Sequence, residues 1–209
     1  MRKKIILIGG APIIGKSFIA EKLSIELGIP WISTDIIREL MRGVVRKEDY
    51  PILSYFTKAK AETYLKKHAP EQIVADQNKE SIEVWKGIKA FIDGNYVWDS
   101  YIIEGVAILP RLVYKDFRNN KSIKPLFILD DNEKRIRKVV YKRGLWDDAD
   151  KYPDNVKEVE AKWVIAFNQW LKKEVAKYKF PYIEIKDRSN LIKEIKKLLN
   201  SRQGRIKIQ

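Results

Sequence analysis

Short apolar runs recur along the chain and predict the strands of one buried sheet. They occupy residues 4–8, 31–33, 101–105, 125–129 and 182–185. A run that is apolar throughout is typical of a strand whose two faces are both covered, as in a parallel sheet. The first run is therefore expected near the centre of such a sheet.

Between these runs, apolar residues recur at helical spacing. After the first run, Ile19, Leu23 and Leu27 lie four residues apart. The pattern ends at Gly28, with Pro30 just beyond, which predicts the end of a helix. Further helices are expected over about 36–42, 132–144, 156–177 and 190–199. Strands that alternate with helices predict an α/β fold, in which helices cover both faces of a parallel sheet.

Residues 44–99 show helical patterning and no apolar run of the strand type. Apolar residues over 56–65 predict one amphipathic helix, and those over 73–91 predict a longer one that ends near Gly94. The stretch is too long for a simple crossover between strands. We therefore interpret 44–99 as a helical insertion that builds a substrate pocket against the sheet.

A basic segment precedes the last long helix. The helix expected over 132–144 carries six Lys or Arg residues and runs into an acidic, turn-rich segment over 145–155. A basic helix followed by such a loop is typical of a lid that closes over phosphates, so a lid is predicted over about 137–155. At this length, residues 1–209 are expected to form a single domain.

The loop after the first expected strand carries the most specific motif of the chain. Residues 10–17 match the phosphate-binding P-loop pattern G-x-x-x-x-G-K-S between a strand and a helix. The glycines let backbone N–H groups turn inward around an anion, and the following helix contributes the positive end of its dipole. The expected nucleotide-binding residues are Gly10, Ala11, Pro12, Ile13, Ile14, Gly15, Lys16, Ser17 and Phe18.

The expected ligand of this loop is a nucleotide polyphosphate. Lys16 adds a mobile cation to the loop, and the Ser17 hydroxyl is expected to face a magnesium ion on the phosphates. The alternative is a Gly-rich turn that binds nothing.

Phosphoryl transfer also needs an acid near the magnesium ion. Glu104 ends the strand expected beside the P-loop strand, so its carboxylate would lie near the water shell of the metal. Asp130 and Asp131 end the next strand, and Asp131 is the expected N-cap of the following helix. We favour Glu104 over these two; its alternative is a strand-end carboxylate in solvent.

The acceptor hydroxyl needs a base, and Asp35 is the candidate. It follows the second strand, across the expected cleft from the P-loop. The alternative is that Asp35 only caps the helix from Ile36. A capping box would place Glu or Gln three residues on, where this chain has Arg38, which we expect at the same cleft.

Of the lid arginines, Arg143 is favoured over Arg137 as the cation on the phosphates, because it adjoins the lid loop.

Composition narrows the classes of function. The chain contains no cysteine, which excludes disulfides, zinc–thiolate sites and thiol nucleophiles. No apolar run approaches the length of a membrane span, so we expect a cytoplasmic protein without a membrane partner. The net charge of +14 suits nucleic-acid binding. Because 33% of the residues are charged, we favour another explanation of the net charge over nucleic-acid binding. This explanation is a Lys-rich solvated surface of the kind found in thermophile proteins.

Three further segments carry a resemblance to a known family. Residues 33–42 (STDIIRELMR), 103–110 (IEGVAILP) and 129–133 (LDDNE) resemble the successive signatures of the 2-phosphoglycerate kinase-like P-loop proteins. The long insertion with Gln77 and Trp85 is also similar, and the resemblance covers residues 4 to about 185. It implies the three-layer P-loop NTPase fold of the nucleoside-monophosphate-kinase-like group, with a five-stranded parallel sheet, a helical substrate-binding insertion and a lid.

The resemblance implies an enzyme that moves the γ-phosphoryl group of ATP, with Mg²⁺, to a hydroxyl of a small anionic metabolite such as a phosphorylated hydroxy acid. The chain departs from the family at Ala107, where the family has His, and over 144–148 in the lid. Both departures concern the choice of acceptor. Lys16, Asp35 and Arg143 are the expected catalytic residues; Asp35, Arg38 and Glu104 are expected to contact substrate, and Ser17 and Glu104 the metal.

Two other classes of function stay open. An RNA- or tRNA-directed or nucleoside-type kinase would explain segment 186–209, which carries eight basic residues against two acidic ones. A non-catalytic ATP-binding regulator would keep the P-loop without needing Asp35 or the lid arginines. The expected partners are a nucleotide and a small-molecule acceptor, and the expected assembly is a monomer or a homodimer.

Overall fold

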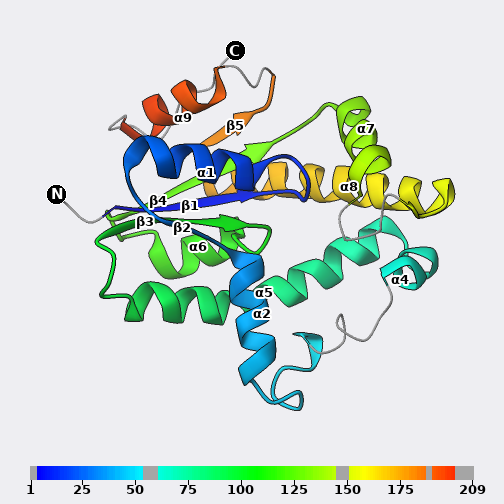
Figure 1. Ribbon diagram of the computed structural model, residues 1–209, viewed down its shortest axis with the longest axis horizontal. Helices are drawn as coiled ribbons and strands as arrows, with labels where there is room; N and C mark the ends of the chain where they lie inside the picture. Colours follow the sequence, from blue (N-terminus) through cyan, green and yellow to red (C-terminus); the bar gives the residue numbers. More distant parts are fainter. Residues whose placement is uncertain (1–3, 54–60, 145–150, 187–189, 201–209) are drawn as a thin grey trace.

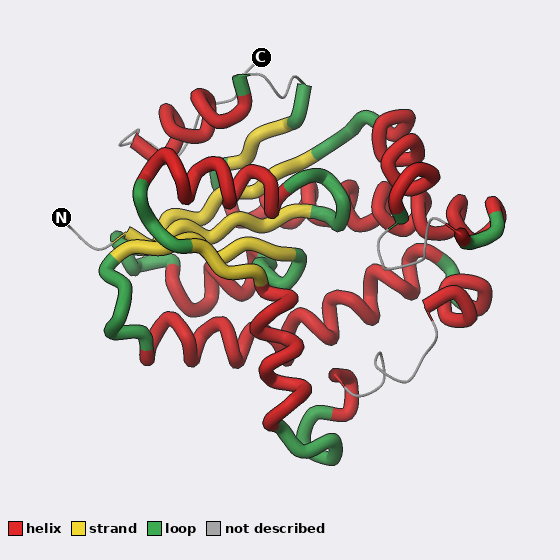
Figure 2. The backbone as a smooth tube through the Cα atoms, in the orientation of Figure 1, coloured by secondary structure: helices red, strands yellow, loops and turns green. Residues whose placement is uncertain are grey.

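The five apolar runs form the strands of one sheet. The computed structural model describes residues 4–53, 61–144, 151–186 and 190–200. Its strands are β1 (Lys4–Gly10), β2 (Trp31–Ser33), β3 (Ser100–Gly105), β4 (Ile123–Leu129) and β5 (Tyr182–Glu184). They lie in the order β2-β3-β1-β4-β5, and every neighbouring pair is parallel. Figure 2 shows the strands side by side with helices around them, which confirms the expected five-stranded parallel sheet.

Helices cover both faces of this sheet. They are α1 (Lys16–Leu27), α2 (Thr34–Val44), α4 (Ala61–Lys67), α5 (Pro70–Gly94), α6 (Pro110–Phe117), α7 (Glu133–Arg143), α8 (Asp154–Tyr178) and α9 (Leu191–Asn200). On one side α1 contacts α9, and on the other α6 contacts α8 (Figure 1). The expected α/β architecture is therefore confirmed. No helix in the described part of the chain is long and apolar enough to cross a membrane.

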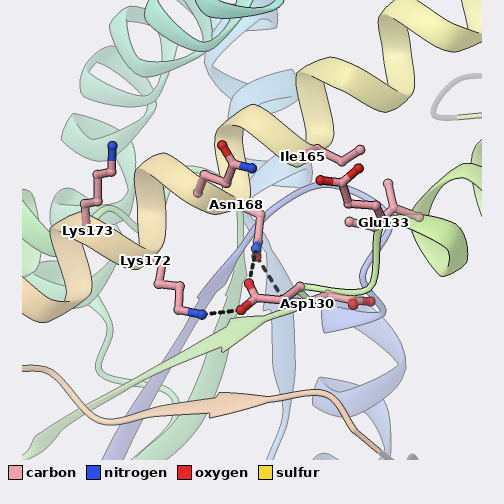
Figure 3. A pocket seen from close by; sticks show the side chains of 9 residues that line it. Asp130, Glu133, Ile165, Asn168, Lys172 and Lys173 are labelled. Carbon is pink, nitrogen blue, oxygen red and sulfur yellow. Dashed lines mark hydrogen bonds and ion pairs between the residues drawn. The ribbon is translucent and has the colours of Figure 1, made fainter.

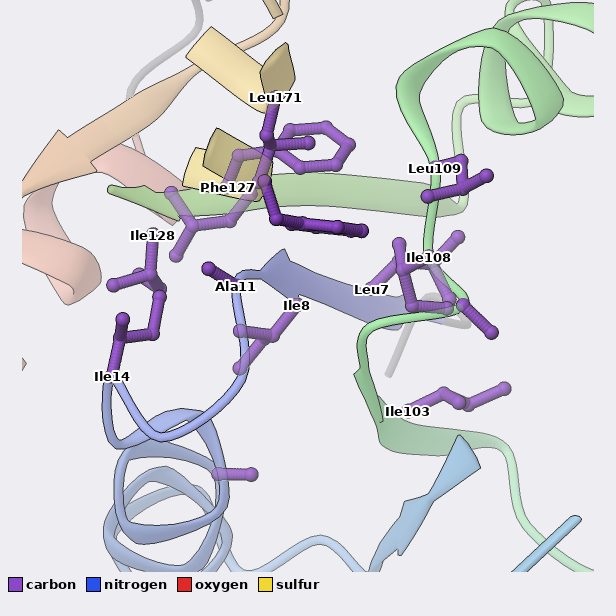
Figure 4. Close-up of a cluster of buried hydrophobic side chains, with 14 of the residues drawn as sticks. Leu7, Ile8, Ala11, Ile14, Ile103, Ile108, Leu109, Phe127, Ile128 and Leu171 are labelled. Carbon is purple, nitrogen blue, oxygen red and sulfur yellow. The ribbon is translucent and has the colours of Figure 1, made fainter. Parts of the chain in front are cut away.

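The centre of the sheet supplies the hydrophobic core. In β1, residues 5–8 are at most 2% exposed. Figure 4 shows Leu7 of β1, Ile103 of β3 and Phe127 of β4 in one cluster, together with Leu171 of α8. Close packing on both faces holds the carboxyl ends of these strands, and the loops that follow them, in fixed relative positions.

Within the described residues, the segment between β2 and β3 consists of helices joined by short turns and contains no strand. Helix α2 runs away from the sheet and packs against α5, which in turn packs against α8 (Figure 1). Residues 56–60 of the first expected helix lie outside the described residues, as do residues 145–150 of the expected lid. The insertion over 44–99 and the lid over 137–155 therefore stay predictions as functional units.

The structure decides two caps that the sequence left to position and residue type. The side chain of Ser33 caps α2 by accepting a hydrogen bond from the backbone N–H of Asp35 at 3.1 Å, so the alternative that Asp35 only caps this helix is wrong. Helix α7 is capped by Asn132, whose side chain accepts from a backbone N–H three residues on at 2.9 Å, so the assignment of Asp131 is also wrong. Both carboxylates are thereby left for other contacts.

Candidate functional site

The loop from β1 to α1 has a backbone geometry that requires its glycines. Gly15 immediately precedes α1 with φ 98° and ψ 23°, in the left-handed region that other residues rarely adopt. A Cβ atom on Gly10 would lie 2.7 Å from the Ile14 side chain and 2.9 Å from the carbonyl oxygen of Ile128. The loop thus curls at the N-terminus of α1, where unpaired N–H groups and the helix dipole favour an anion.

Lys16 begins α1 and is 7% exposed. Its Nζ donates a hydrogen bond to the carbonyl oxygen of Ala11 at 2.6 Å, so the ammonium lies against its own loop. Burial lowers the pKa of Lys16, and the carboxylates of Glu104 and Asp35 raise it in part. Its charge is therefore desolvated, a setting in which it interacts more strongly with an anion than it would in water.

Ser17 and Glu104 form a pair of oxygen ligands beside this loop. Because β3 is the neighbour of β1, Glu104 lies opposite Ile8, and Ser17 Oγ donates to Glu104 Oε1 at 3.0 Å. Burial raises the pKa of Glu104, while Lys16 and the Ser17 hydrogen bond lower it in part. Mg²⁺ prefers hard oxygen donors and commonly takes one or two protein groups, with phosphates and water completing its shell. The pair therefore fits a magnesium ion.

Asp35 and Arg38 lie one turn apart on α2, at the carboxyl edge of the sheet. Arg38 Nη1 is 3.1 Å from Asp35 Oδ1, and the two side chains are 22% and 61% exposed. Burial opposes the charge of Arg38, but the carboxylates of Asp35, Glu80 and Glu39 outweigh it and raise the pKa of Arg38. The pair thus offers an accessible carboxylate next to a permanently charged guanidinium.

A cleft of about 450 Å³ joins the P-loop to this pair. Its lining residues are Pro12, Ile13, Gly15, Lys16, Ser17, Phe18, Asp35, Arg38, Gln77, Glu104, Gly105, Val106, Arg143 and Trp163. The volume lies in the range typical of small-molecule sites. The expected catalytic, substrate and metal residues therefore meet in one cleft, whereas Gly10, Ala11 and Ile14 of the loop are buried and do not line it.

Four lining residues have no predicted role in the sequence. Gly105 and Val106 directly follow the predicted Glu104, whereas Trp163 and Gln77 come from distant helices. Trp163 on α8 belongs to an aromatic pattern that indicates a helix core, and it is 3% exposed although it lines the cleft. Gln77 on α5 is one polar residue in a long amphipathic helix. Only its place in the resemblance to 2-phosphoglycerate kinase-like proteins singles it out in the sequence.

The two lid arginines have different surroundings. Arg137 is 2.9 Å from Glu133 and 3.4 Å from Glu158, so its charge is paired on the surface of α7 and α8. Arg143, the last residue of α7, lines the cleft. Of the two, Arg143 is thus the one among the described residues that line the cleft, and its contact with phosphates stays a prediction.

The carboxylates that follow β4 make contacts elsewhere. Asp130 is 2% exposed and accepts two hydrogen bonds from Arg135 at 2.6 and 2.8 Å. Asp131 pairs with Lys172 and accepts from Asn168 at 3.1 Å. These residues line a second pocket of about 320 Å³, and Figure 3 shows it with Asn168 and Lys172 labelled. Asp130 thus ties the end of β4 to α7, and Asp131 ties it to α8. Neither is among the described residues that line the P-loop cleft.

The P-loop, the parallel strand order and the cleft at the carboxyl edge together define a class by fold, the P-loop NTPases. Deoxyadenosine kinase from M. mycoides matches this fold with a TM-score of 0.53 and 16% identity, over 95% of this chain and all of that chain (100%). A gluconokinase from Sinorhizobium meliloti 1021 matches with a TM-score of 0.51 and 11% identity, over 95% of this chain and 90% of that one. At these identities the likeness concerns the fold.

In sequence, the chain is a relative of the archaeal 2-phosphoglycerate kinases, as its motifs indicate. It is 33% identical over 145 residues to the 2-phosphoglycerate kinase of Methanocaldococcus jannaschii, a match that covers 68% of this chain and 47% of that protein. The enzyme of that name from Methanococcus maripaludis is 30% identical over 190 residues, 86% of this chain and 59% of that protein. The chain thus spans about half the length of the curated relatives it matches. No family model matches it.

Gly105, which ends β3, is expected to tolerate no side chain. Its φ is 153°, and a Cβ atom there would lie 1.7 Å from Thr34 Oγ1, at the start of α2. Gly105→Ala should displace α2 and lower the free energy of unfolding by about 1–3 kcal/mol. Gly43→Ala is the control on α2, because a Cβ atom there meets no heavy atom within 4 Å. It should be neutral or stabilise by up to about 1 kcal/mol. Urea unfolding measures both, and equal stabilities would contradict this packing.

Glu104 is expected to oppose folding at neutral pH. Because burial raises its pKa in the folded state above the ordinary value of 4.5, the folded protein holds this proton more tightly than the unfolded chain does. Ionised Glu104 therefore lowers the free energy of unfolding. This loss of stability is absent below about pH 4.5 and complete above the raised pKa of Glu104. Glu104→Gln should therefore raise Tm at neutral pH, and the gain should vanish below about pH 4.5. Thermal scans across pH test this, and a lower Tm of the variant at neutral pH would refute it.

Proposed function

We propose that this protein transfers the γ-phosphoryl group of ATP to a hydroxyl of a small anionic metabolite. The observation that carries the proposal is the single cleft in which a P-loop with Lys16 faces an accessible carboxylate, Asp35, beside the guanidinium of Arg38. Nucleotide binding alone does not require such a pair opposite the phosphates. The relatives named 2-phosphoglycerate kinase support a phosphorylated hydroxy acid as the class of acceptor.

On the nucleotide side, residues 10–18 bind the polyphosphate of ATP. Ser17 and Glu104 would hold the magnesium ion, which neutralises phosphate charge when bound. Lys16, and Arg143 from a lid over about 137–155, add cations at the γ-phosphoryl group. Cations aimed at the site where charge develops stabilise the transition state more than the bound substrate, and this difference accelerates transfer.

On the acceptor side, Arg38 binds an anionic group and Asp35 accepts the proton of the hydroxyl. The oxygen of that hydroxyl forms a bond to the γ-phosphorus, while the bond from this phosphorus to the β–γ bridging oxygen breaks and ADP leaves. Glu104 completes the substrate contacts at the carboxyl end of β3. We further propose that residues 1–209 act as one domain, with 44–99 as the acceptor-binding insertion, in a monomer or homodimer.

An acceptor screen tests this function. ATP consumption by the purified protein with magnesium is measured with phosphorylated hydroxy acids, unphosphorylated hydroxy acids, nucleosides and tRNA. We expect the highest kcat/KM with a phosphorylated hydroxy acid. A higher value with a nucleoside or tRNA would reassign the acceptor, and ATP binding without acceptor-dependent consumption would favour a regulator. The acids are varied widely because Ala107, which replaces the histidine of the family, follows the cleft residue Val106.

A further inference from the structure

A buried carboxylate on α5 connects two arginines of α2. The Glu80 side chain is 6% exposed; Arg42 Nη2 lies 2.9 Å from its Oε1, and Arg38 Nη1 lies 3.8 Å from its Oε2. Gln77 Nε2 donates a hydrogen bond to the same Oε2 at 3.3 Å. Glu80 thus contacts both Arg38 and Gln77, two residues that line the acceptor side of the cleft.

The two arginines have different tasks. Arg42 donates to the carbonyl oxygen of Leu53 at 3.2 Å, to Glu39 at 2.7 Å and to Glu80 at 2.9 Å, so each of its three guanidinium nitrogens is hydrogen-bonded within the protein. Arg38 lines the cleft, and within the described part of the chain it hydrogen-bonds only through Nε, to Glu39 at 3.2 Å. Arg42 therefore fixes Glu80, whereas Arg38 keeps hydrogen-bonding capacity for a ligand.

Stability is a poor explanation for this cluster. Burial raises the pKa of Glu80, although Arg38 and Arg42 lower it; Asp35 raises it further. Ionised Glu80 therefore opposes folding at neutral pH. Buried ion pairs often stabilise a fold less than apolar residues of the same volume. A charged side chain at this buried position of α5 is better explained by its effect on Arg38, which it holds in position.

We infer that Glu80 is a positioning residue that holds Arg38 as the docking group for the anionic part of the acceptor. Arg42 and Gln77 fix Glu80, and its charge keeps the Arg38 guanidinium at the cleft while the ligand anion competes with Asp35 for it. Once the anion has displaced Asp35 from Arg38, the Asp35 carboxylate is available to the acceptor hydroxyl. The inference deepens the proposed function and rests on it for the identity of the acceptor.

A matched pair of variants tests the inference. Glu39 contacts the same two arginines as Glu80, but its side chain is 57% exposed, so Glu39→Gln is the control for Glu80→Gln. Titration calorimetry with 2-phosphoglycerate as the probe, and separately with ATP, gives the dissociation constants of the wild type, both variants and Arg38→Gln. A Tm measurement on each variant shows whether it is folded.

The inference predicts a selective loss of anion binding. Glu80→Gln and Arg38→Gln should weaken 2-phosphoglycerate binding at least about tenfold, and Glu39→Gln less than about threefold. ATP affinity should stay unchanged in all of them. Because Glu80 acts through Arg38, the double variant should bind the probe no more weakly than Arg38→Gln alone.

Three results would overturn the inference: equal effects of Glu80→Gln and Glu39→Gln, parallel loss of ATP and probe affinity, or no probe binding by the wild type. If Glu80→Gln does not fold, Glu80→Asp keeps the charge on a shorter side chain and must show the same selective loss. Phosphoryl transfer to the probe is assayed separately. If the wild type binds the probe but does not phosphorylate it, the proposed function is contradicted and the inference stands. If the wild type phosphorylates the probe but Glu80→Gln binds it with unchanged affinity, the inference is contradicted and the proposed function stands.

Discussion

Lys16→Ala should lower the rate of phosphoryl transfer at least about a hundredfold. Lys16 is buried at the N-terminus of α1 and hydrogen-bonds the backbone of its own loop, so its charge is preorganised where the phosphates would lie. Such a cation stabilises the charge that develops on the β- and γ-phosphates more strongly in the transition state than in the bound substrate. The loss should therefore appear in kcat and not in KM alone.

Lys115→Ala is the control for this experiment, because Lys115 is an exposed lysine of α6 away from the cleft. It should leave kcat and the KM for ATP within about twofold of the wild type, as expected for an exposed side chain without a role at the site. Steady-state kinetics with the best acceptor of the screen measures both variants. Normal turnover by a folded Lys16→Ala protein would show that the loop is not a catalytic P-loop.

Asp35→Asn should lower the rate about a hundred- to ten-thousandfold, the usual effect of removing a general base. The structure makes this variant more informative than the sequence alone would. Ser33, and not Asp35, caps α2, so the substitution removes a basic oxygen without removing a cap. The Asp35 side chain is 61% exposed, and its ion pair with Arg38 is expected to contribute at most about 1 kcal/mol after solvent screening. Tm should therefore change little, and ATP affinity should persist because the P-loop lies across the cleft.

Asp49→Asn provides a matched control for Asp35→Asn. Asp49 also forms an exposed ion pair with an arginine three residues away, Arg46, at 2.9 Å, and its side chain is 50% exposed. Its substitution should affect Tm as little as Asp35→Asn does and leave the rate unchanged. Single-turnover kinetics, the ATP dissociation constant and Tm are measured on both. Full activity of Asp35→Asn would exclude Asp35 as the base.

The sheet and the P-loop can be predicted from the sequence because both depend on patterns that are local in the chain. A strand buried on both faces must be apolar throughout, and a loop that curls around an anion needs glycine where φ is positive, as at Gly15. The proximity of Glu104 and Ser17 can be predicted in a similar way. Once β3 is the neighbour of β1, the residue at the end of β3 must approach the start of α1.

Contacts between segments that are distant in the sequence are harder to predict. Glu80 occupies one position of a long amphipathic helix and has no local feature that separates it from a surface glutamate until α2 packs against α5. Trp163 follows the helical period of the core, although α8 brings it to the cleft. The type and position of Asp131 predict a cap, but Asn132 caps α7 and leaves Asp131 to Lys172. The short helix α6 has too few residues to establish a helical period.

The central claim is that the cleft couples the P-loop to an acceptor held by α2. It is tested most directly by following ATP and the best acceptor of the screen by ³¹P NMR, with the wild type, Lys16→Ala and Asp35→Asn in parallel. We predict that the wild type forms ADP and a new phosphate ester of the acceptor in equal amounts, and that both variants form this ester at least about a hundredfold more slowly. Release of ADP and inorganic phosphate at the same rate with and without acceptor, or unchanged ester formation in both variants, would contradict the account.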